Sequence, residues 1–407
     1  MTNKPTPKIL ILDDDPFMVK LLEHMLTSLG FNQLISYDNG KMALASLDSP
    51  SSQPDLILLD LNMPEMDGIE VVRHLVGKSY SGSIILVSGE DARMLQTSER
   101  LVNAHKILLL GSLQKPINPQ NLSVLLDGWE PPGHLYKQDA KKIYGAGHLR
   151  AAIVNHEFVN YYQPKVEVVS GKVVGVESLV RWDHPQDGIV FPDQFIGVAE
   201  DNGLINVLTR EIISKAFYQT RIWRDAGLYL RVAINLSMES LDALEFVDYV
   251  TMAAATAGIV PDDIVFEVTE SRLMRNLTTS LEVLTRLRLK RFHLSIDDFG
   301  TGHSSLSQLR DLPFNELKVD QGFVHGATSN HTLRSIYNAS LSLAHQLGMK
   351  AVAEGVENQA DWDLISSSGC DIAQGYFIAK PMPADEIHDW VIRWEANTEN
   401  LITPPDE

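Results

Sequence analysis

Acidic and amide side chains recur along this sequence at or just beyond the ends of short apolar runs. In the larger, C-terminal part of the chain these residues are Glu177, Asn235, Glu267, Glu270, Asp297, Asp298, Asp320, Glu354, Glu357 and Gln374, with Lys318 among them. Carboxylates gathered this closely repel one another, and two divalent cations would resolve that conflict. Ligands that are all oxygen atoms favour Mg2+ or Mn2+ over Zn2+, and no His or Cys spacing indicates a zinc site.

This set of residues predicts metal-assisted hydrolysis of a phosphate ester. Two metals about 4 Å apart can activate a water molecule and stabilise the oxygens of an in-line displacement at phosphorus. Lys318 could hold or help deprotonate that water, and Glu354 could serve as a ligand or base. The run Asp297–Gly302 adds paired acids followed by glycines, which suit a flexible loop. Alone, such a run is as typical of an ordinary turn, but its place among the other acids favours a metal site.

A second, smaller constellation lies nearer the N-terminus. Asp13 and Asp14 follow the first apolar run, Asp60 ends the third, Ser88 ends the fourth and Lys115 follows the fifth. Because the carboxyl ends of parallel strands meet at one edge of a sheet, these side chains are expected to converge. The set suits phosphoryl transfer, in which acids hold Mg2+ and one carboxylate attacks phosphorus. A single acid at such a junction is more often a helix cap, but four strand ends with compatible chemistry favour function.

The elements that must position this smaller constellation occupy about the first 127 residues. Helical spacing of apolar residues marks Asp15–Leu29 and Gly68–Leu75. Strand-like runs alternate with the helical stretches at Lys8–Leu12, Leu34–Ser36, Leu56–Leu59, Ile84–Val87 and Ile107–Leu113. This alternation predicts an α/β fold with a doubly wound, five-stranded parallel sheet.

The larger constellation requires a different architecture. Glu130–Gly133 reads as a break, and a helical segment at Asp139–Phe158 is expected to lead into a second domain. Strand-like runs then follow at Tyr161–Val166, Val173–Trp182, Leu230–Leu236, Ile264–Val268, His293–Ile296, Glu316–Val319, Lys350–Ala353 and Ile372–Ile378. Eight runs over about 240 residues predict a (β/α)8 barrel with its chemistry at the carboxyl ends of the strands. The short turn at Ser170–Lys172 predicts one antiparallel strand.

Composition excludes several classes of protein. The net charge is −19 and no cluster of Lys and Arg is present, so we expect no nucleic-acid polymer as partner. No run approaches the roughly 18 apolar residues of a membrane span, so we expect no membrane association. The N-terminus lacks the apolar core of a signal peptide, and the lone Cys370 suits a reducing compartment, so a cytoplasmic location is expected. Cys370 itself is expected to be buried and structural.

The smaller constellation carries a family resemblance over residues 6–127. The runs Ile9–Pro16, Leu59–Gly68, Val87–Gly89 and Lys115-Pro116 resemble a response-regulator receiver domain. The resemblance implies Asp60 as phosphoacceptor, Asp13 and Asp14 as the Mg2+ pair, Ser88 as switch hydroxyl and Lys115 as phosphate partner. It also implies a histidine kinase or phosphotransfer protein as partner. One departure is Ser112, which stands where many receivers have an aromatic switch residue.

The larger constellation resembles the EAL family of cyclic-di-GMP phosphodiesterases over residues 145–393. The matching motifs, in order, are Tyr162–Lys165, Glu177–Trp182, Asn235–Ser237, Glu267–Glu270, Asp297-Asp298, Lys318–Asp320, Glu354–Glu357 and Gln374–Tyr376. The resemblance implies hydrolysis of cyclic di-GMP to linear pGpG with two Mg2+ or Mn2+ ions per site, in a homodimer or higher oligomer. Two departures are Ser178, in place of the signature alanine, and His303, in place of a usual tyrosine in the mobile loop.

The same resemblance implies a role for each site residue. Metal ligands would be Glu177, Asn235, Glu267, Asp297, Asp298 and Glu354, and Lys318 and Glu354 would act at the attacking water. Residues lining the substrate groove would be Gln163, Leu179, Arg181, Asp320, Glu357, Gln374 and Pro381. Glu270 would brace the loop after the fifth strand.

The sequence leaves alternatives open at the level of function and regulation. The barrel could be a catalytically silent receptor or scaffold for cyclic di-GMP, although no metal or water residue is missing. The receiver could be an assembly surface whose phosphorylation at Asp60 leaves catalysis unchanged. Residues 128–144 are expected to form a linker, and residues 394–407 a polar tail.

Overall fold

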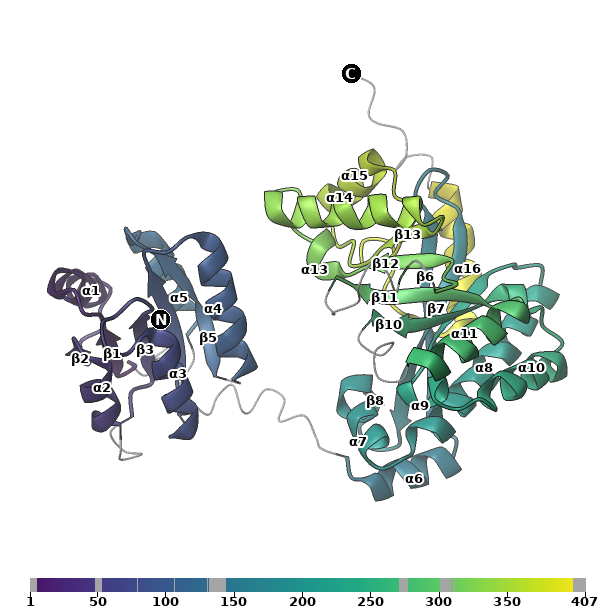
Figure 1. Cartoon of the computed structure of the whole chain (residues 1–407), viewed down its shortest axis with the longest axis horizontal. Coiled ribbons are helices and arrows are strands. Elements are labelled where there is room, and N and C mark those ends of the chain that lie inside the picture. Colours follow the sequence, from purple (N-terminus) through teal and green to yellow (C-terminus); the bar gives the residue numbers. More distant parts are fainter. Residues whose placement is uncertain are drawn as a thin grey trace. The chain divides into compact units, whose positions relative to one another are not determined.

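The computed structural model describes residues 6–47, 53–78, 80–105, 107–129, 131, 144–270, 277–300, 309 and 312–397 (Figure 1). The chain divides into two compact units, Met1–Lys142 and Ile143–Glu407. Within the described ranges, every helix is too short or too polar to cross a membrane.

The N-terminal unit contains a five-stranded parallel sheet in the order β2-β1-β3-β4-β5, as predicted. Its strands are β1 Ile9–Leu12, β2 Leu34–Tyr37, β3 Leu56–Asp60, β4 Ser83–Ser88 and β5 Leu108–Gln114. Its helices are α1 Pro16–Ser28, α2 Gly40–Ser46, α3 Gly68–Gly77, α4 Ala92–Ala104 and α5 Pro119–Asp127.

Strand β1 shows why helices cover both faces of this sheet. Ile9 and Ile11 pack into one apolar cluster with residues of α1 and α5. Leu10 and Leu12 pack into another cluster, which holds residues of α2, α3 and α4. Successive side chains of a strand point to opposite faces, so a continuous apolar run needs cover on both sides.

Helix α1 begins where its sequence dictates. The side chain of Asp15 accepts a hydrogen bond of 2.8 Å from the backbone N–H of Phe17, and Pro16 occupies the first helical position. Both features are favoured at helix N-termini. The predicted range Asp15–Leu29 therefore matches the helix with its two capping residues.

The C-terminal unit is an eight-stranded barrel with one additional strand. Its strands are β6 Phe158–Glu167, β7 Val173–His184, β8 Gly188–Val190, β9 Arg231–Asn235, β10 Ile264–Thr269, β11 His293–Phe299, β12 Glu316–Val319, β13 Lys350–Ala353 and β14 Ile372–Ala373. Pairing of β6 with β7 closes the barrel, and β6 is antiparallel to both β7 and β14, which confirms the predicted antiparallel strand. Strand β8, which pairs with the end of β7, was not predicted.

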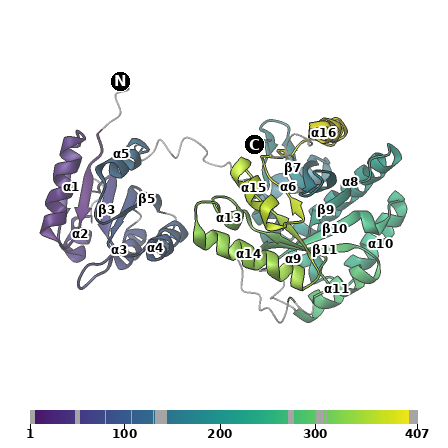
Figure 2. The ribbon, with the colours of Figure 1, turned by 90° about the horizontal axis from the view of Figure 1, so that it is seen from above.

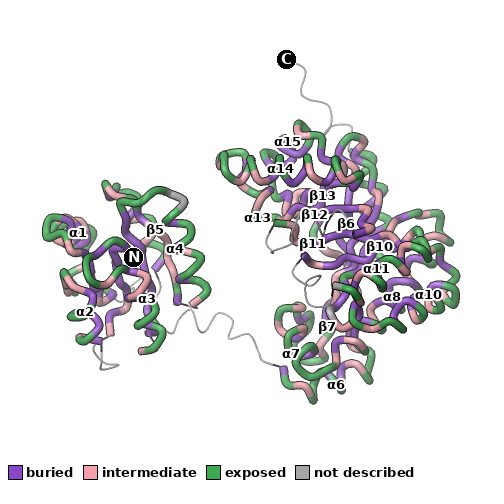
Figure 3. Tube along the Cα trace, viewed as in Figure 1, coloured by how far each residue is buried: buried purple, intermediate pink, exposed green. Residues whose placement is uncertain are grey.

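Helices surround the barrel strands (Figure 2). They are α6 Ala146–Val154, η2 Pro192–Gln194, α7 Ile196–Asp201, α8 Ile205–Asp225, α9 Met238–Leu241, α10 Phe246–Ala257, η3 Pro261–Asp263, α11 Leu277–Leu289, α13 Gln321–Val324, α14 His331–Gln346, α15 Gln359–Ser368 and α16 Ala384–Asn397. In both units the strands are largely buried, while the helices expose their outer faces (Figure 3). Cys370 is buried, as expected.

Most predicted elements differ by a few residues at their ends, and three predicted segments differ more substantially. The helix expected at Asp139–Phe158 ends at Val154, because His156 adopts a positive φ of 57° and Phe158 begins β6; residues 139–143 lie outside the described part. Strand β14 ends at Ala373 rather than Ile378, because the N–H groups of Ile378 and Ala379 both turn back to the carbonyl of Gly375. Helix α16 continues to Asn397, so residues 394–397 of the expected tail are helical.

Candidate active site

Lys318 on β12 lies at the centre of the larger constellation. Its neighbours Leu317 and Val319 belong to the apolar core of the barrel unit, so strand alternation directs Lys318 to the opposite face. Only 1% of its side chain is exposed. Its Nζ contacts four carboxylates: Glu354 Oε1 at 2.7 Å, Asp297 Oδ1 at 2.9 Å, Glu267 Oε2 at 3.0 Å and Glu177 Oε2 at 3.6 Å. The structure thus gathers carboxylates from four different strands or strand ends around one ammonium group.

A second lysine, which the sequence did not single out, holds the other side of Glu267. Lys165 on β6 is buried, and its Nζ donates to Glu267 Oε1 at 2.5 Å. Both oxygens of Glu267 therefore face an ammonium group. Lys165 lies in the first motif of the EAL resemblance, two residues after Gln163, and period-2 alternation from Gln163 could have revealed it.

A chain of amides fixes Glu177 in place. Asn235 Nδ2 donates to Glu177 Oε1 at 2.8 Å, and Gln374 Nε2 donates to Glu177 Oε2 at 2.7 Å. Gln374 Nε2 also lies 3.0 Å from Gln163 Oε1, and Gln163 Nε2 donates to the carbonyl of Ala379 at 3.0 Å. Four predicted residues from four separate strands or strand ends thus share one hydrogen-bond network.

Burial and neighbouring charges separate the pKa values of the acids. Burial raises the pKa of Glu267 to about 7 and, aided by Asp297 and Glu177, that of Glu354 to about 8. Burial acts in the same direction on Glu177, but Lys318 and Lys165 outweigh it and lower that pKa to about 2. The surrounding carboxylates likewise raise the pKa of Lys318, against the effect of its burial. Two lysines thus leave part of the acid cluster without compensating positive charge.

The donor set fits divalent cations. Oxygens of Asp297, Asp298 and Glu354 lie within 4.8 Å of one another. Burial and the adjacent Asp297 raise the pKa of Asp298, as expected for carboxylates that lack sufficient neighbouring positive charge. All candidate ligands are oxygen atoms, and carboxylate oxygens suit Mg2+ or Mn2+.

The backbone at the end of β11 contains two residues with positive φ. Asp298 has φ 54° and Gly300 has φ 98°, both in the left-handed region. The carboxylate of Glu270 accepts a 2.9 Å hydrogen bond from the N–H of Gly300. This contact is the one that the proposed bracing role of Glu270 requires. Residues 301–308, including His303, lie outside the described residues.

A cavity of about 460 Å³ adjoins these acids. Its lining residues are Gln163, Glu177, Leu179, Asp298, Asp320, Gln321, Glu354, Gly355, Glu357, Gln374, Gly375 and Tyr376. Five of the seven predicted groove residues are in this set, and Arg181 and Pro381 are not. Arg181 instead places its guanidinium 4.9 Å from the ring centroid of Phe191 and donates to the carbonyl of Val180. Gln321 was missed because no motif contains it.

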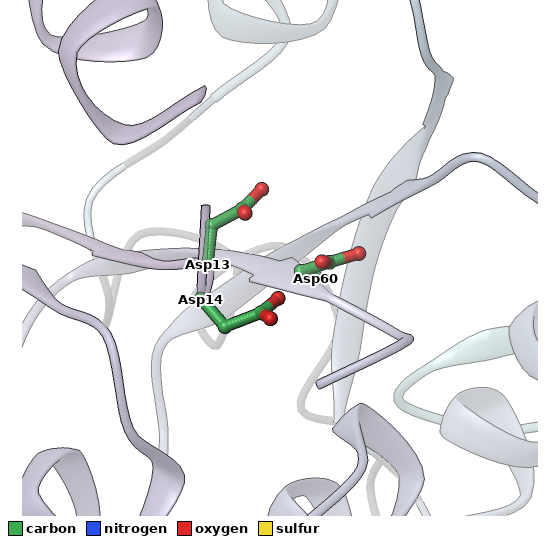
Figure 4. Close-up of side chains that lie close together, drawn as sticks. All are labelled: Asp13, Asp14 and Asp60. Atoms are coloured by element: carbon green, nitrogen blue, oxygen red, sulfur yellow. The ribbon is translucent and has the colours of Figure 1, made fainter. Parts of the chain in front are cut away.

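In the N-terminal unit, Lys115 joins two of the predicted acids. Its Nζ lies 2.8 Å from Asp13 Oδ2 and 3.0 Å from Asp60 Oδ2. Oxygens of Asp13, Asp14 and Asp60 lie within 4.8 Å of one another, and Figure 4 shows the three side chains gathered at neighbouring strand ends. Burial raises the pKa of Asp60, while its hydrogen bond to Lys115 acts in the opposite direction.

The two hydroxyl positions of this unit differ in what they contact. Ser88 is buried, and its Oγ accepts a 3.0 Å hydrogen bond from the N–H of Glu90. Ser112 on β5 donates to Glu99 Oε1 on α4 at 2.5 Å. The position that departs from the receiver pattern thus ties β5 to α4 through a polar contact.

Comparison with known proteins identifies both units. Residues 146–381 match the family described as EAL domain, and residues 9–127 match the response regulator receiver domain. Cyclic di-GMP phosphodiesterase RocR of Pseudomonas aeruginosa is 31% identical over 390 residues, which cover 94% of this chain and 98% of RocR.

A second relative matches the barrel alone. This relative is the bifunctional diguanylate cyclase/cyclic di-GMP phosphodiesterase MucR of Pseudomonas aeruginosa. The two sequences are 39% identical over 240 residues, which make up 59% of this chain but only 35% of MucR. The solved structure of the PaMucR phosphodiesterase in complex with c-di-GMP superimposes with a TM-score of 0.57, over 59% of this chain and 98% of that one. The chain therefore belongs to the EAL domain family and carries a response regulator receiver domain before its EAL domain.

Proposed function

We propose that this protein hydrolyses cyclic di-GMP to the linear dinucleotide pGpG with bound divalent cations. The observation that carries the proposal is the buried Lys318, which contacts four carboxylates beside a cavity that Glu177 and Glu354 line. The substrate rests on similarity to RocR, a cyclic di-GMP phosphodiesterase that the chain matches over almost its whole length.

The metal ligands in this proposal are the oxygen donors around Lys318. They are Glu177, Asn235, Glu267, Asp297, Asp298 and Glu354. Bound Mg2+ or Mn2+ would supply an activated water and neutralise charge on the phosphate oxygens. Lys318 would hold that water by donating from its ammonium group, and Glu354, which lines the cavity 2.7 Å from Lys318 Nζ, would accept the proton.

Substrate recognition would fall to the remaining wall of the cavity. Gln163, Leu179, Asp320, Glu357 and Gln374 line it, and we assign them to contacts with the dinucleotide. Arg181 and Pro381 keep a proposed role at the margin of the groove. Gln321 and Tyr376 join the candidates, because both also line the cavity.

Regulation would begin at the receiver. We propose that a histidine kinase or phosphotransfer protein phosphorylates Asp60, with Mg2+ held by Asp13 and Asp14, and that this changes the rate of hydrolysis. The ion pairs of Lys115 support this role, because its ammonium can neutralise a phosphate on Asp60. A homodimer or higher oligomer is also proposed, and light scattering of the purified protein tests it.

The decisive experiment incubates purified protein with cyclic di-GMP and Mg2+ or Mn2+ and follows the nucleotides by chromatography. Glu354→Ala and Asp60→Ala are run beside the wild type, with and without a small-molecule phosphodonor. We expect pGpG from the wild type, none from Glu354→Ala, and no response to the phosphodonor in Asp60→Ala. Binding of cyclic di-GMP without turnover under every condition would contradict the proposal and favour a receptor.

A further inference from the structure

A second charged network reaches the cavity through one of its members and contains none of the acids assigned to metal binding. It consists of His325, which follows α13, Asp361 in the first turn of α15, and Glu357 in the loop after β13. Asp361 is 1% exposed, and its Oδ2 lies 3.0 Å from Nδ1 of His325. Nε2 of His325 lies 3.8 Å from Oε2 of Glu357. Only Glu357 of these three lines the cavity.

The buried carboxylate of Asp361 ties together two segments that form the wall. Its Oδ2 accepts a 3.1 Å hydrogen bond from the backbone N–H of Glu357, and its Oδ1 accepts one of 3.4 Å from the N–H of Gly326. The first bond fixes the loop that follows β13. The second, with His325, fixes the end of the segment that begins with Asp320 and Gln321. A buried carboxylate with such partners is costly to disturb.

The loop after β13 and the segment that begins with Asp320 and Gln321 are also in close contact. Gly355 has φ 64°, and a Cβ built on it would lie 2.3 Å from Cβ of Gln321. A shift of either segment therefore moves the other. Asp361 and His325 do not line the cavity, so they can stabilise this contact from outside it.

We propose that Asp361 and His325 are positioning residues that hold Glu357 on the cavity wall for an anionic dinucleotide, and that protonation of His325 strengthens substrate binding. This inference rests on the proposed function. The described charged groups that face His325 are Asp361 on α15 and Glu357 after β13. A protonated imidazole pairs with Glu357 and reduces negative charge at a cavity that must accept phosphates.

The direction of the pH effect follows from these contacts. The hydrogen bond to Asp361 raises the pKa of His325 above its usual 6.5. The positive charge is therefore present in mildly acidic solution and is lost as the pH rises through that raised value. KM for the substrate should rise in the same window, while kcat changes little, because Glu357 would hold substrate and transition state alike.

The test compares His325→Gln with wild type at pH 6 and pH 9. Glutamine can still donate to Asp361 but carries no charge. Because the half-exposed ion pair is weak, we expect the variant's KM to exceed that of wild type about threefold at pH 6 and to equal it at pH 9. Taking this ratio cancels the titration of the other acids of the site. Asp361→Asn should raise KM about tenfold at both pH values, since it breaks a charged hydrogen bond.

His345→Gln is the matched control. Nε2 of His345 lies 2.9 Å from Asp371 Oδ2, which also accepts the N–H of Ala351 at 2.8 Å. The same kind of pair thus lies at the start of β13, at the other end of the strands. Its variant should leave KM unchanged at both pH values.

The outcomes distinguish failure of the positioning role of Asp361 and His325 from failure of the proposed hydrolysis. A KM ratio that is flat with pH, or a loss confined to kcat, would overturn the positioning role while leaving hydrolysis established. If Asp361→Asn melts at a much lower temperature, His325→Gln alone decides, because its side chain is half exposed. If wild type binds cyclic di-GMP without turnover, calorimetric Kd values replace KM. If wild type neither hydrolyses nor binds it, both the proposed function and this inference fail.

Discussion

Each of the two candidate sites places a lysine among carboxylates, but the two lysines are buried to different degrees. In the receiver, Lys115 is 22% exposed and contacts two carboxylates. In the barrel, Lys318 is 1% exposed and contacts four, one of which is shared with Lys165. Both lysines contact acids that lie on or just after different strands of one sheet, so sheet topology rather than sequence proximity gathers each set.

The difference in depth matches the difference in proposed chemistry. A carboxylate that becomes phosphorylated must be reachable and needs only enough positive charge to balance the incoming phosphate. A site that must bind two cations gains from an excess of buried acids, which are costly to leave without them. We therefore expect stronger repulsion among the carboxylates of the barrel site than of the receiver site, and a stronger dependence of barrel stability on its lysines and on bound metal.

The largest effect is expected from Lys318→Met. The change leaves four carboxylates, three of them buried, short of a counter-ion, which should destabilise the barrel by about 3–5 kcal/mol. Loss of the group that holds the water should lower hydrolysis by at least about a thousandfold. Calorimetric unfolding and nucleotide chromatography measure the two effects. Lys350→Met, at an exposed position of β13, is the control, and an equal loss there would contradict the assigned role.

Removal of metal should come next. Chelation should abolish hydrolysis reversibly, and Mg2+ or Mn2+ at about a hundredfold excess over Kd should stabilise the barrel by about 2.7 kcal/mol. The physical reason is that cations relieve repulsion among Asp297, Asp298 and Glu354. The measurement is the unfolding temperature of wild type and Asp298→Asn against metal concentration. An identical metal response in both proteins would count against the proposed ligand set.

Lys115→Met should have a smaller effect. Its ammonium is partly exposed and has two partners, so we expect about 1–2 kcal/mol of destabilisation in the receiver. The rate of phosphate incorporation at Asp60 should also fall, which phosphate-affinity electrophoresis would measure. Lys41→Met removes a contact of 3.1 Å to Glu65 at an exposed site and should change stability by less than about 1 kcal/mol. Equal effects of the two variants would show that the partly buried ion pairs of Lys115 stabilise the receiver no more than an exposed one.

The smallest effect is expected from Ser112→Ala. It removes the 2.5 Å hydrogen bond to Glu99, which is partly buried, and should lower receiver stability by about 1 kcal/mol. Ser36→Ala removes an exposed hydrogen bond of 2.9 Å to Glu23 and should cost less. If Ser112 also transmits phosphorylation, Ser112→Ala will reduce the response to a phosphodonor. An unchanged response would limit the contact to stability.

Many helices and strands could be predicted from the local pattern of apolar and capping residues. The predicted runs at Lys8–Leu12 and Glu316–Val319 are strands in the structure, the first from Ile9, and Asp15 and Pro16 begin a helix at the predicted position. Errors arose where backbone contacts overrode the pattern. The run at Ile372–Ile378 is apolar enough for a long strand, but the turn at Gly375 ends it because that glycine packs against the backbone of Val356.

The sequence by itself determined which chemical groups are available and at which strand ends they stand. Position along the strand-like runs and motif order placed Glu177, Glu267 and Lys318 in the candidate set, since both can be read from local sequence. Only the tertiary structure decided which groups touch. The pairing of Lys165 with Glu267, 102 residues apart, and of His325 with Asp361 depends on barrel closure and loop packing. Side-chain contacts across different strands and loops are set by three-dimensional register, which no short window of sequence encodes.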